Sequence, residues 1–240
     1  MTRPGLDFAR LAVDLSGNCG GPMRRLPHAI QAGLLAAGVL AAPPALAHPH
    51  VFVDARAEVV FDAPGTISAV RNIWQFDRAF SEYAIQGLDV DGDGKLSDEE
   101  LKPLAKVNVE SLAEYDFFTF LTVGRQKFAF SPPSEYWLEF RNGRLTLFYT
   151  LPLKEPVAMQ KGITLEIFDP EYFVAFSFVK DNPIALAGAA PDCAAEYRPP
   201  HALDNATMSA LSAIPRDQNL PPELVDAAVG LAHLFVLTCP

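Results

Sequence analysis

Residues 89–100 read Asp-Val-Asp-Gly-Asp-Gly-Lys-Leu-Ser-Asp-Glu-Glu, and oxygen-bearing side chains stand at alternate positions of the first half. Gly94 occupies the point where such a loop must turn sharply. The positions that would direct an oxygen at an ion are Asp89, Asp91, Asp93, Lys95 through its carbonyl, Ser97 through a water molecule and Glu100 through both carboxylate oxygens. This spacing is that of an EF-hand loop, so the sequence predicts a Ca²⁺ site here.

The alternative is a solvated acidic turn that binds nothing. Carboxylates this close repel one another unless a cation neutralises them, so we expect the loop to be ordered with calcium and loose without it. Ser97 and Glu100 also form a capping-box pattern, so Glu100 could cap the following helix or coordinate the ion. We expect coordination of the ion to prevail. The chain has no second copy of the loop, which favours a structural or low-affinity extracytoplasmic site, with a dissociation constant on the order of 10⁻⁴ to 10⁻³ M.

Residues 1–47 have the pattern of a leader, and translation could start at Met1 or at Met23. Met23 precedes two arginines, an apolar run follows from Ala29 to Ala42, and a small-x-small motif ends at Ala47. This order predicts a signal peptide cleaved after Ala47 and a periplasmic mature protein. An uncleaved membrane anchor is the alternative, although the apolar run is short for a membrane span.

The predicted mature chain is acidic and holds two cysteines. Four of the 19 basic and two of the 29 acidic residues fall in the leader, which leaves 15 basic and 27 acidic residues. Such a surface makes nucleic acid an improbable partner. Cys193 and Cys239 are expected to form one disulfide, worth roughly 3 to 4 kcal/mol for a loop of about 45 residues. A pair of soft metal ligands is the competing interpretation, but close Cys-x-x-Cys spacing is missing.

The pattern of apolar residues predicts an α+β fold with a mainly antiparallel sheet. Strands are expected at 51–61, at 67–74, at 120–123, at 127–130, on both sides of Asn142-Gly143 in 136–150, and as a pair at 163–168 and 173–179. Helices at 78–88 and from 98 to about 115 would flank the calcium loop as an inserted EF-hand-like helix-loop-helix. We expect an α+β domain at 48–184, then a Pro/Ala-rich connection and a helical C-terminal part at 185–240, tied by the disulfide.

Cleavage after Ala47 would place His48-Pro49-His50 at a free amino terminus. The amine and imidazole of His48 with the imidazole of His50 suit nickel, cobalt, copper or zinc. Asp54 shares a strand face with His50, but about 13 Å of strand separates them, so we assign Asp54 an outer-shell role. His201 and His233 are further candidates, and two histidines on a frayed end are the alternative.

Several stretches together resemble the domain-of-unknown-function 1007 family of exported bacterial proteins. They are 48–54 (His-Pro-His-Val-Phe-Val-Asp), 74–77 (Trp-Gln-Phe-Asp), the loop from Asp89, and 168–173 (Phe-Asp-Pro-Glu-Tyr-Phe). The resemblance implies the periplasmic component of an uncharacterised ABC-type transport system linked to nickel and cobalt. It implies no catalytic residues, and the chain carries none of the common hydrolase, phosphate-loop or zinc-protease motifs.

These observations lead to one functional hypothesis and two alternatives. The hypothesis is a divalent-metal-binding accessory protein of a nickel, cobalt or zinc transport system, with structural calcium and an inner-membrane transporter as its partner. The first alternative is a copper redox protein with a terminal histidine brace. The second is a calcium-stabilised interaction module without catalysis, which predicts an exposed apolar patch.

Overall fold

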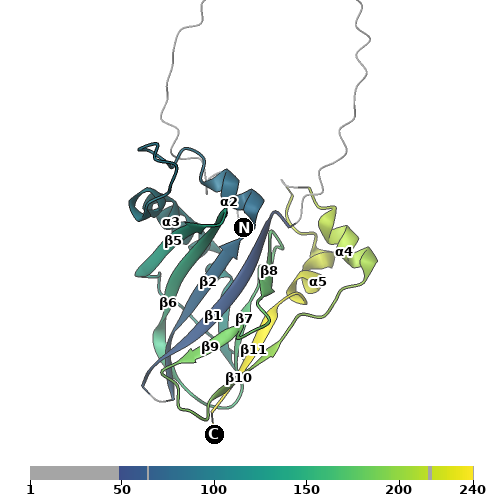
Figure 1. The fold of residues 1–240 in the computed structure, drawn as a ribbon. Helices are drawn as coiled ribbons and strands as arrows, with labels where there is room; N and C mark the ends of the chain where they lie inside the picture. Colours follow the sequence, from purple (N-terminus) through teal and green to yellow (C-terminus); the bar gives the residue numbers. More distant parts are fainter. Residues whose placement is uncertain (1–48, 64, 216–217, 240) are drawn as a thin grey trace, which may run out of the picture.

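The computed structural model describes residues 49–63, 65–215 and 218–239. In this part of the chain two β-sheets pack face to face, and helices α2 and α3 lie near one end of the sandwich (Figure 1). The larger sheet has the order β5-β6-β2-β1-β8, with β9 also paired to β1. Its strands are β1 (Val51–Ala63), β2 (Thr66–Phe76), β5 (Glu135–Arg141), β6 (Arg144–Ala158), β8 (Val174–Phe178) and β9 (Ile184–Ala187). The fold is therefore a mixed α+β fold in which strands dominate.

The second sheet has the order β10-β11-β7-β3-β4. It contains β3 (Thr119–Val123), β4 (Gln126–Phe128), β7 (Ile163–Ile167), β10 (Ala194–Arg198) and β11 (His233–Thr238). Its buried residues Leu121, Leu165 and Phe235 pack in the same core as the larger sheet. Burial of such apolar side chains between the sheets is the main force that holds them together.

The β1–β2 and β5–β6 hairpins form because alternating side chains give each strand one buried face. In β1 the odd-numbered residues from Val51 to Phe61 are buried, and the residues between them are exposed or half-buried. The β5–β6 hairpin turns at Asn142 (φ 55°) and Gly143 (φ 75°), the left-handed pair that a two-residue hairpin loop needs. Trp74 of β2 lies at the centre of the core, with its ring 5.1 Å from that of Tyr149.

The predicted pairing of residues 163–168 with 173–179 is wrong. β7 joins the five-stranded sheet between β11 and β3, whereas β8 runs parallel to β1 in the other sheet. β9 is also parallel to β1. The physical reason is the turn around Asp169, whose side chain accepts backbone hydrogen bonds and sends the chain from one sheet to the other. The larger sheet is therefore mixed rather than wholly antiparallel.

The helix boundaries differ from the predicted ones. α2 spans Arg78–Ala84 instead of reaching residue 88, because Gly87 takes a left-handed φ of 78° that a helix cannot contain. α3 spans Asp98–Leu112 and contains Pro103 in its second turn, where the proline leaves the Glu99 carbonyl without its helical N–H donor. Within the described residues no helix is both long and apolar enough to cross a membrane.

The C-terminal part is less helical than predicted. It contains α4 (Asn205–Ser212), the short turn η2 (Pro222–Leu224) and α5 (Val225–Val229), but also β9's last residues, β10 and β11. The disulfide between Cys193 and Cys239 is present. It continues the β10–β11 ladder one residue beyond the pair Ala194 and Thr238. This disulfide is compatible with an exported protein; the predicted leader lies outside the described residues.

A strained turn, η1 (Ala113–Phe118), connects α3 to β3. Asp116, Phe117 and Phe118 have φ values of 53°, 54° and 49°, a conformation that costs about 1–2 kcal/mol for each side chain with a Cβ. Phe117 and Phe118 are buried, and two buried phenyl rings contribute roughly 3–6 kcal/mol. The Phe117 carbonyl also accepts hydrogen bonds from Thr119 Oγ1 (2.9 Å) and Tyr149 OH (3.3 Å). Burial of the two phenyl rings and the hydrogen bonds to the Phe117 carbonyl thus offset the strain energy of this turn.

Candidate metal centres

The acid loop between α2 and α3 folds around its own carboxylates. Both oxygens of Asp89 accept backbone N–H groups, from Gly92 (2.8 Å) and Gly94 (3.0 Å). Asp91 Oδ1 accepts the N–H of Asp93 at 3.1 Å, and Asp93 Oδ1 accepts that of Lys95 at 2.7 Å. These bonds turn the aspartates toward one centre, and ligand oxygens of Asp89, Asp91 and Asp93 lie within 4.8 Å of one another.

Glu100 takes part in the helix cap and lies outside this group of three. Ser97 and Glu100 form a capping box at the start of α3. Glu100 Oε2 accepts the Ser97 N–H at 2.9 Å, and Oε1 accepts the Val90 N–H at 2.7 Å. These bonds, led by the one from the Ser97 backbone, lower the pKa of Glu100 to about 2. Glu100 therefore stays ionised and closes the loop from its last position to its second.

The loop has the donors that a hard cation prefers. Three carboxylates converge, and Gly94 has the left-handed φ of 77° that the turn requires. Leu88 before the loop is buried, and Leu96 within it packs against the core. The loop is thus anchored at both sides while its acidic groups face solvent. Calcium coordination by the six predicted residues stays a prediction.

A second region of interest is the start of β1, where the His-Pro-His stretch enters the sheet. The N–H of His50 donates to the Phe173 carbonyl at 2.8 Å, and its ring stacks on the Phe173 ring at a centroid distance of 5.7 Å. His50 is half-buried. It is therefore not on a frayed end, whereas His48 lies outside the described residues.

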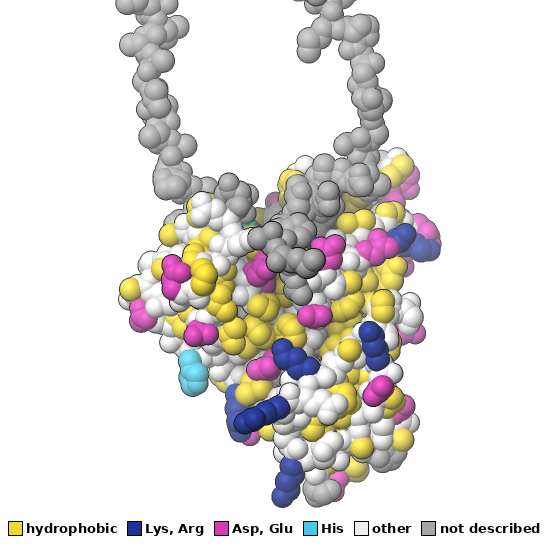
Figure 2. Space-filling view, turned by 180° about the vertical axis from the view of Figure 1, so that it is seen from behind, with side chains coloured by type: hydrophobic (Ala, Val, Ile, Leu, Met, Phe, Trp, Pro, Cys, Tyr) yellow, Lys and Arg dark blue, Asp and Glu magenta, His cyan; other side chains and the backbone are white. Residues whose placement is uncertain are grey.

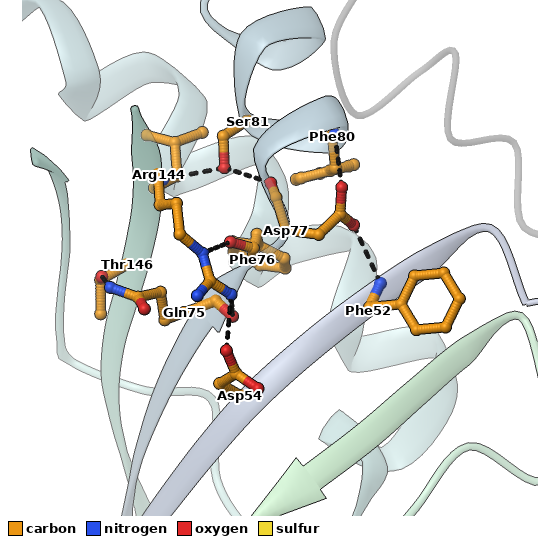
Figure 3. Close-up of polar contacts among 10 residues, drawn as sticks. Phe52, Asp54, Gln75, Phe76, Asp77, Phe80, Ser81, Arg144 and Thr146 are labelled. Atoms are coloured by element: carbon orange, nitrogen blue, oxygen red, sulfur yellow. Dashed lines mark hydrogen bonds and ion pairs between the residues drawn. The ribbon is translucent and has the colours of Figure 1, made fainter. Parts of the chain in front are cut away.

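Asp77 joins Phe52, the second residue of β1, to α2, as Figure 3 shows. Its Oδ2 accepts the Phe52 N–H at 3.0 Å, and its own N–H donates to the Phe52 carbonyl at 2.9 Å. Its Oδ1 caps α2 by accepting the Phe80 N–H at 2.9 Å. One carboxylate thus joins the start of β1 to the helix that leads into the acid loop.

Asp54 is engaged by Arg144. Arg144 Nη2 lies 2.7 Å from Asp54 Oδ2, and its Nε donates to the Phe76 carbonyl at 2.6 Å (Figure 3). The charge of Asp54 is therefore partly neutralised. In this arrangement Asp54 helps to fix β1 against β2 and β6, and its predicted outer-shell role toward a metal stays a prediction.

The Asp169 turn completes this junction from the other side. Asp169 accepts backbone N–H groups from Glu171 (2.8 Å), Phe173 (2.8 Å) and Val174 (2.9 Å). The carboxyl group is almost fully buried, and this burial raises its pKa to about 6 in spite of these donors. The turn presents the Phe173 carbonyl and ring to His50.

In the described part of the chain, neither His201 nor His233 joins His50 in a metal cluster. Both ring nitrogens of His233 are bonded, Nε2 donating to the Phe176 carbonyl (2.9 Å) and Nδ1 accepting from Tyr197 OH (2.7 Å). Burial lowers the pKa of His233, which keeps the ring neutral. His201 is exposed. In the described ranges only Asp89, Asp91 and Asp93 form a group of three or more candidate ligands.

The junction at β1 is the arrangement that sequence reasoning missed. Three stretches noted separately, 48–54, 74–77 and 168–173, meet there through Phe52–Asp77 and His50–Phe173 hydrogen bonds. A local signal existed for each part, since Asp77 and Asp169 precede residues whose N–H groups need acceptors. Their convergence depends on sheet pairing and has no local signal.

These features define a two-sheet α+β protein with an acidic loop and a histidine held at the entry of its first strand. A family model described as "Protein of unknown function (DUF1007)" matches residues 33–239. The chain belongs to this family.

Two relatives are similar to this chain, and both are uncharacterised. One is an uncharacterized 15.5 kDa protein in the trpE 3′ region of Spirochaeta aurantia, 30% identical over 98 residues that cover 41% of this chain and 70% of the relative. The other is an uncharacterized protein of Haemophilus influenzae, 22% identical over 196 residues that cover 81% of this chain and 92% of the relative. Neither assigns a ligand.

Proposed function

We propose that this protein is an exported divalent-metal-binding accessory protein of a transition-metal transport system, with Ca²⁺ as a structural ion. The observation that carries the metal-binding part is the acid loop, where the ligand oxygens of three aspartates lie within 4.8 Å of one another. Calcium would sit among Asp89, Asp91 and Asp93, and Glu100 would leave its capping role to complete the coordination. Bound calcium would neutralise the loop and fix α2 relative to α3.

The transition-metal part rests on the junction at β1. The His50 N–H donates to the Phe173 carbonyl, and the Phe52 N–H donates to the Asp77 carboxylate. These bonds fix the backbone that would follow a mature terminus at His48. Nickel, cobalt, zinc or copper would bind the amine and imidazole of His48 with the imidazole of His50. An inner-membrane transporter would then receive the metal from this terminus.

Isothermal titration of protein that begins at His48 tests the transition-metal part. Ni²⁺, Co²⁺, Zn²⁺ and Cu²⁺ should each be titrated into the parent and into the double variant His48→Ala with His50→Ala. The matched control is His201→Ala, which removes one exposed imidazole elsewhere. We expect binding tighter than millimolar that the double variant loses and the control keeps. Equal binding by all three proteins would refute the histidine site.

An interaction module is the second candidate, because aromatic side chains are exposed on the outer face of the larger sheet. Phe52 is 55% exposed and Trp137 is 43% exposed. The Trp137 ring stacks on Phe148 of β6 at 4.8 Å and an interplanar angle of 4°. Metal binding lost with the histidines would favour the accessory role, whereas partner binding lost in Trp137→Ala alone would favour the module.

A further inference from the structure

A hollow of about 450 Å³ opens at the edge of the sandwich, where β3 and β4 of one sheet approach β6 of the other. This volume lies in the range of small-molecule sites, about 300–1,000 Å³. Four phenylalanines line it, and two lysines stand among them: Phe117, Phe120, Phe128, Phe130, Lys127 and Lys154. The hollow is away from the acid loop and the start of β1, since none of its lining residues comes from either region.

The walls of this hollow, called the groove from here on, are fixed by backbone hydrogen bonds. The N–H of Ser131 donates to the Pro152 carbonyl at 2.8 Å, and that of Lys154 donates to the Ala129 carbonyl at 2.9 Å. These bonds join the chain after β4 to β6. Phe117 and Leu121 at the groove are buried in the core. The groove is therefore preformed and does not depend on a loose loop.

The charges at the groove favour an anion. The Lys127 ammonium lies over the Phe120 ring, 5.9 Å from its centroid. In the described part of the chain neither Lys127 nor Lys154 forms an ion pair, whereas Lys102 and Lys106 each have a glutamate partner. Asp116 is the acidic residue that lines the groove. Two positive groups thus face one negative group, in a chain whose formal net charge is −10.

The strained turn contributes to the same groove. Asp116 and Phe117, both in the left-handed conformation, belong to its lining. Left-handed conformations of residues other than glycine are concentrated at ligand-binding and catalytic sites, where the surrounding structure maintains them. This turn places the Phe117 side chain in the core and still lets the segment line the groove. It is a second observation, independent of the charges, that favours a ligand here. Figure 2 shows the face of the molecule opposite to the view in Figure 1, and on this face several Lys and Arg side chains lie beside hydrophobic ones.

We propose that this groove binds an amphipathic organic anion, such as an aromatic or short-chain aliphatic carboxylate. The phenylalanine rings contact its apolar body, and the ammonium groups of Lys127 and Lys154 contact its negative head. This site needs neither calcium nor a transition metal, so it goes beyond the proposed metal-handling function.

Fluorescence titration of the full chain with 8-anilinonaphthalene-1-sulfonate, an aromatic anion, tests the proposal. The double variant Lys127→Gln with Lys154→Gln removes the two charges at the groove. The double variant Lys102→Gln with Lys106→Gln removes two charges on α3 and is the matched control. We expect the dissociation constant to rise about threefold for each groove lysine and about tenfold for the pair at low salt, with less than a twofold change in the control. N-phenyl-1-naphthylamine, a neutral probe, should bind all three proteins equally.

The site of binding is located by amide NMR shifts with benzoate as the ligand. We expect the shifted amides to lie in 116–121 and 127–130, with unchanged urea unfolding midpoints for both double variants. An equal change of affinity in the groove variant and the control, or shifts elsewhere in the molecule, would overturn the proposal.

Discussion

Replacing Asp91 by asparagine tests the acid loop, because calcium-free and calcium-bound protein should respond differently. Asp91 is the suitable position since it uses only Oδ1 for a backbone hydrogen bond, which the asparagine oxygen keeps. Asp89 uses both oxygens, so its amide would lose a bond. The change therefore removes a charge and leaves the fold of the loop intact.

The magnitude follows from the spacing of the three carboxylates. At the 4.8 Å that bounds their ligand oxygens, two unit charges in water repel by about 0.9 kcal/mol. Removing the charge of Asp91 ends two of the three repulsions, so the free energy of unfolding without calcium should rise by about 1.7 kcal/mol at low ionic strength. At 0.15 M salt, screening should roughly halve this gain.

Calcium should act on the two proteins unequally. With a dissociation constant of 10⁻⁴ to 10⁻³ M, 10 mM Ca²⁺ should stabilise the parent by about 1.4–2.7 kcal/mol. The Asp91→Asn protein lacks one ligand charge and should gain less than about 0.5 kcal/mol. Urea unfolding followed by circular dichroism measures both quantities, in EGTA, in 10 mM Ca²⁺ and in 10 mM Mg²⁺ as the ionic-strength control.

Two results would refute this reasoning. Equal calcium responses of parent and variant, or none in the parent, would identify the loop as an acidic turn that binds no ion. A variant no more stable than the parent in EGTA would show that the repulsion is already relieved. Glu155→Gln, which removes one exposed carboxylate outside the loop, is the matched control and should change neither quantity.

Three further predictions concern the rest of the fold. Reduction of the disulfide, or the double variant Cys193→Ser with Cys239→Ser, should cost about 4 kcal/mol of unfolding free energy for a sequence separation of 46 residues; a loss under about 1 kcal/mol in urea unfolding would contradict this. Gly188→Ala should lower the melting temperature more than Gly124→Ala. Both have a positive φ, which costs about 1–2 kcal/mol, but only at 188 would a Cβ lie 2.6 Å from a carbonyl oxygen of β1; equal shifts would refute the clash. Because burial raises the pKa of Asp169 from 3.8 to about 6, about 3 kcal/mol of stability should be present below pH 3.8 and lost as the pH rises through 6. Urea midpoints measured against pH for the parent and Asp169→Asn check this, and parallel curves would exclude it.

Local patterns were enough to predict the strand at 51–61 and the hairpin at Asn142-Gly143, but not the partners of 163–168 and 173–179. The alternation in 51–61 decides which face of one strand is buried, and the Asn142-Gly143 turn decides how two consecutive strands pair. Both features can therefore be read from residues close together in the sequence. The partners of β7, β8 and β11 depend on contacts between segments far apart in the chain. The sequence predicts a helical C-terminal part, and it does not indicate that β11 lies between β10 and β7.

The candidate site also has one part that local sequence predicts and one part that depends on how the strands pair. The convergence of Asp89, Asp91 and Asp93 was predictable because the loop pattern is defined by spacing alone, whereas calcium binding by residues 89–100 stays a prediction. The hydrogen bonds of His50 and Phe52 could not be predicted, because their partners Phe173 and Asp77 lie next to them only after the strands have paired. The position of His48 lies outside the described residues, so that part of the metal hypothesis stays a prediction.

The central place of β11 in its sheet affects how the chain can fold. Its neighbours are β10 and β7, and β7 in turn pairs with β3. While the ribosome is still adding residues 233–238, β7 lacks one of its two partners, so the backbone N–H and C=O groups on one of its edges are unpaired. The nascent chain therefore stays incompletely folded until residues 233–238 have been made, and truncation before residue 233 should yield a protein prone to aggregate.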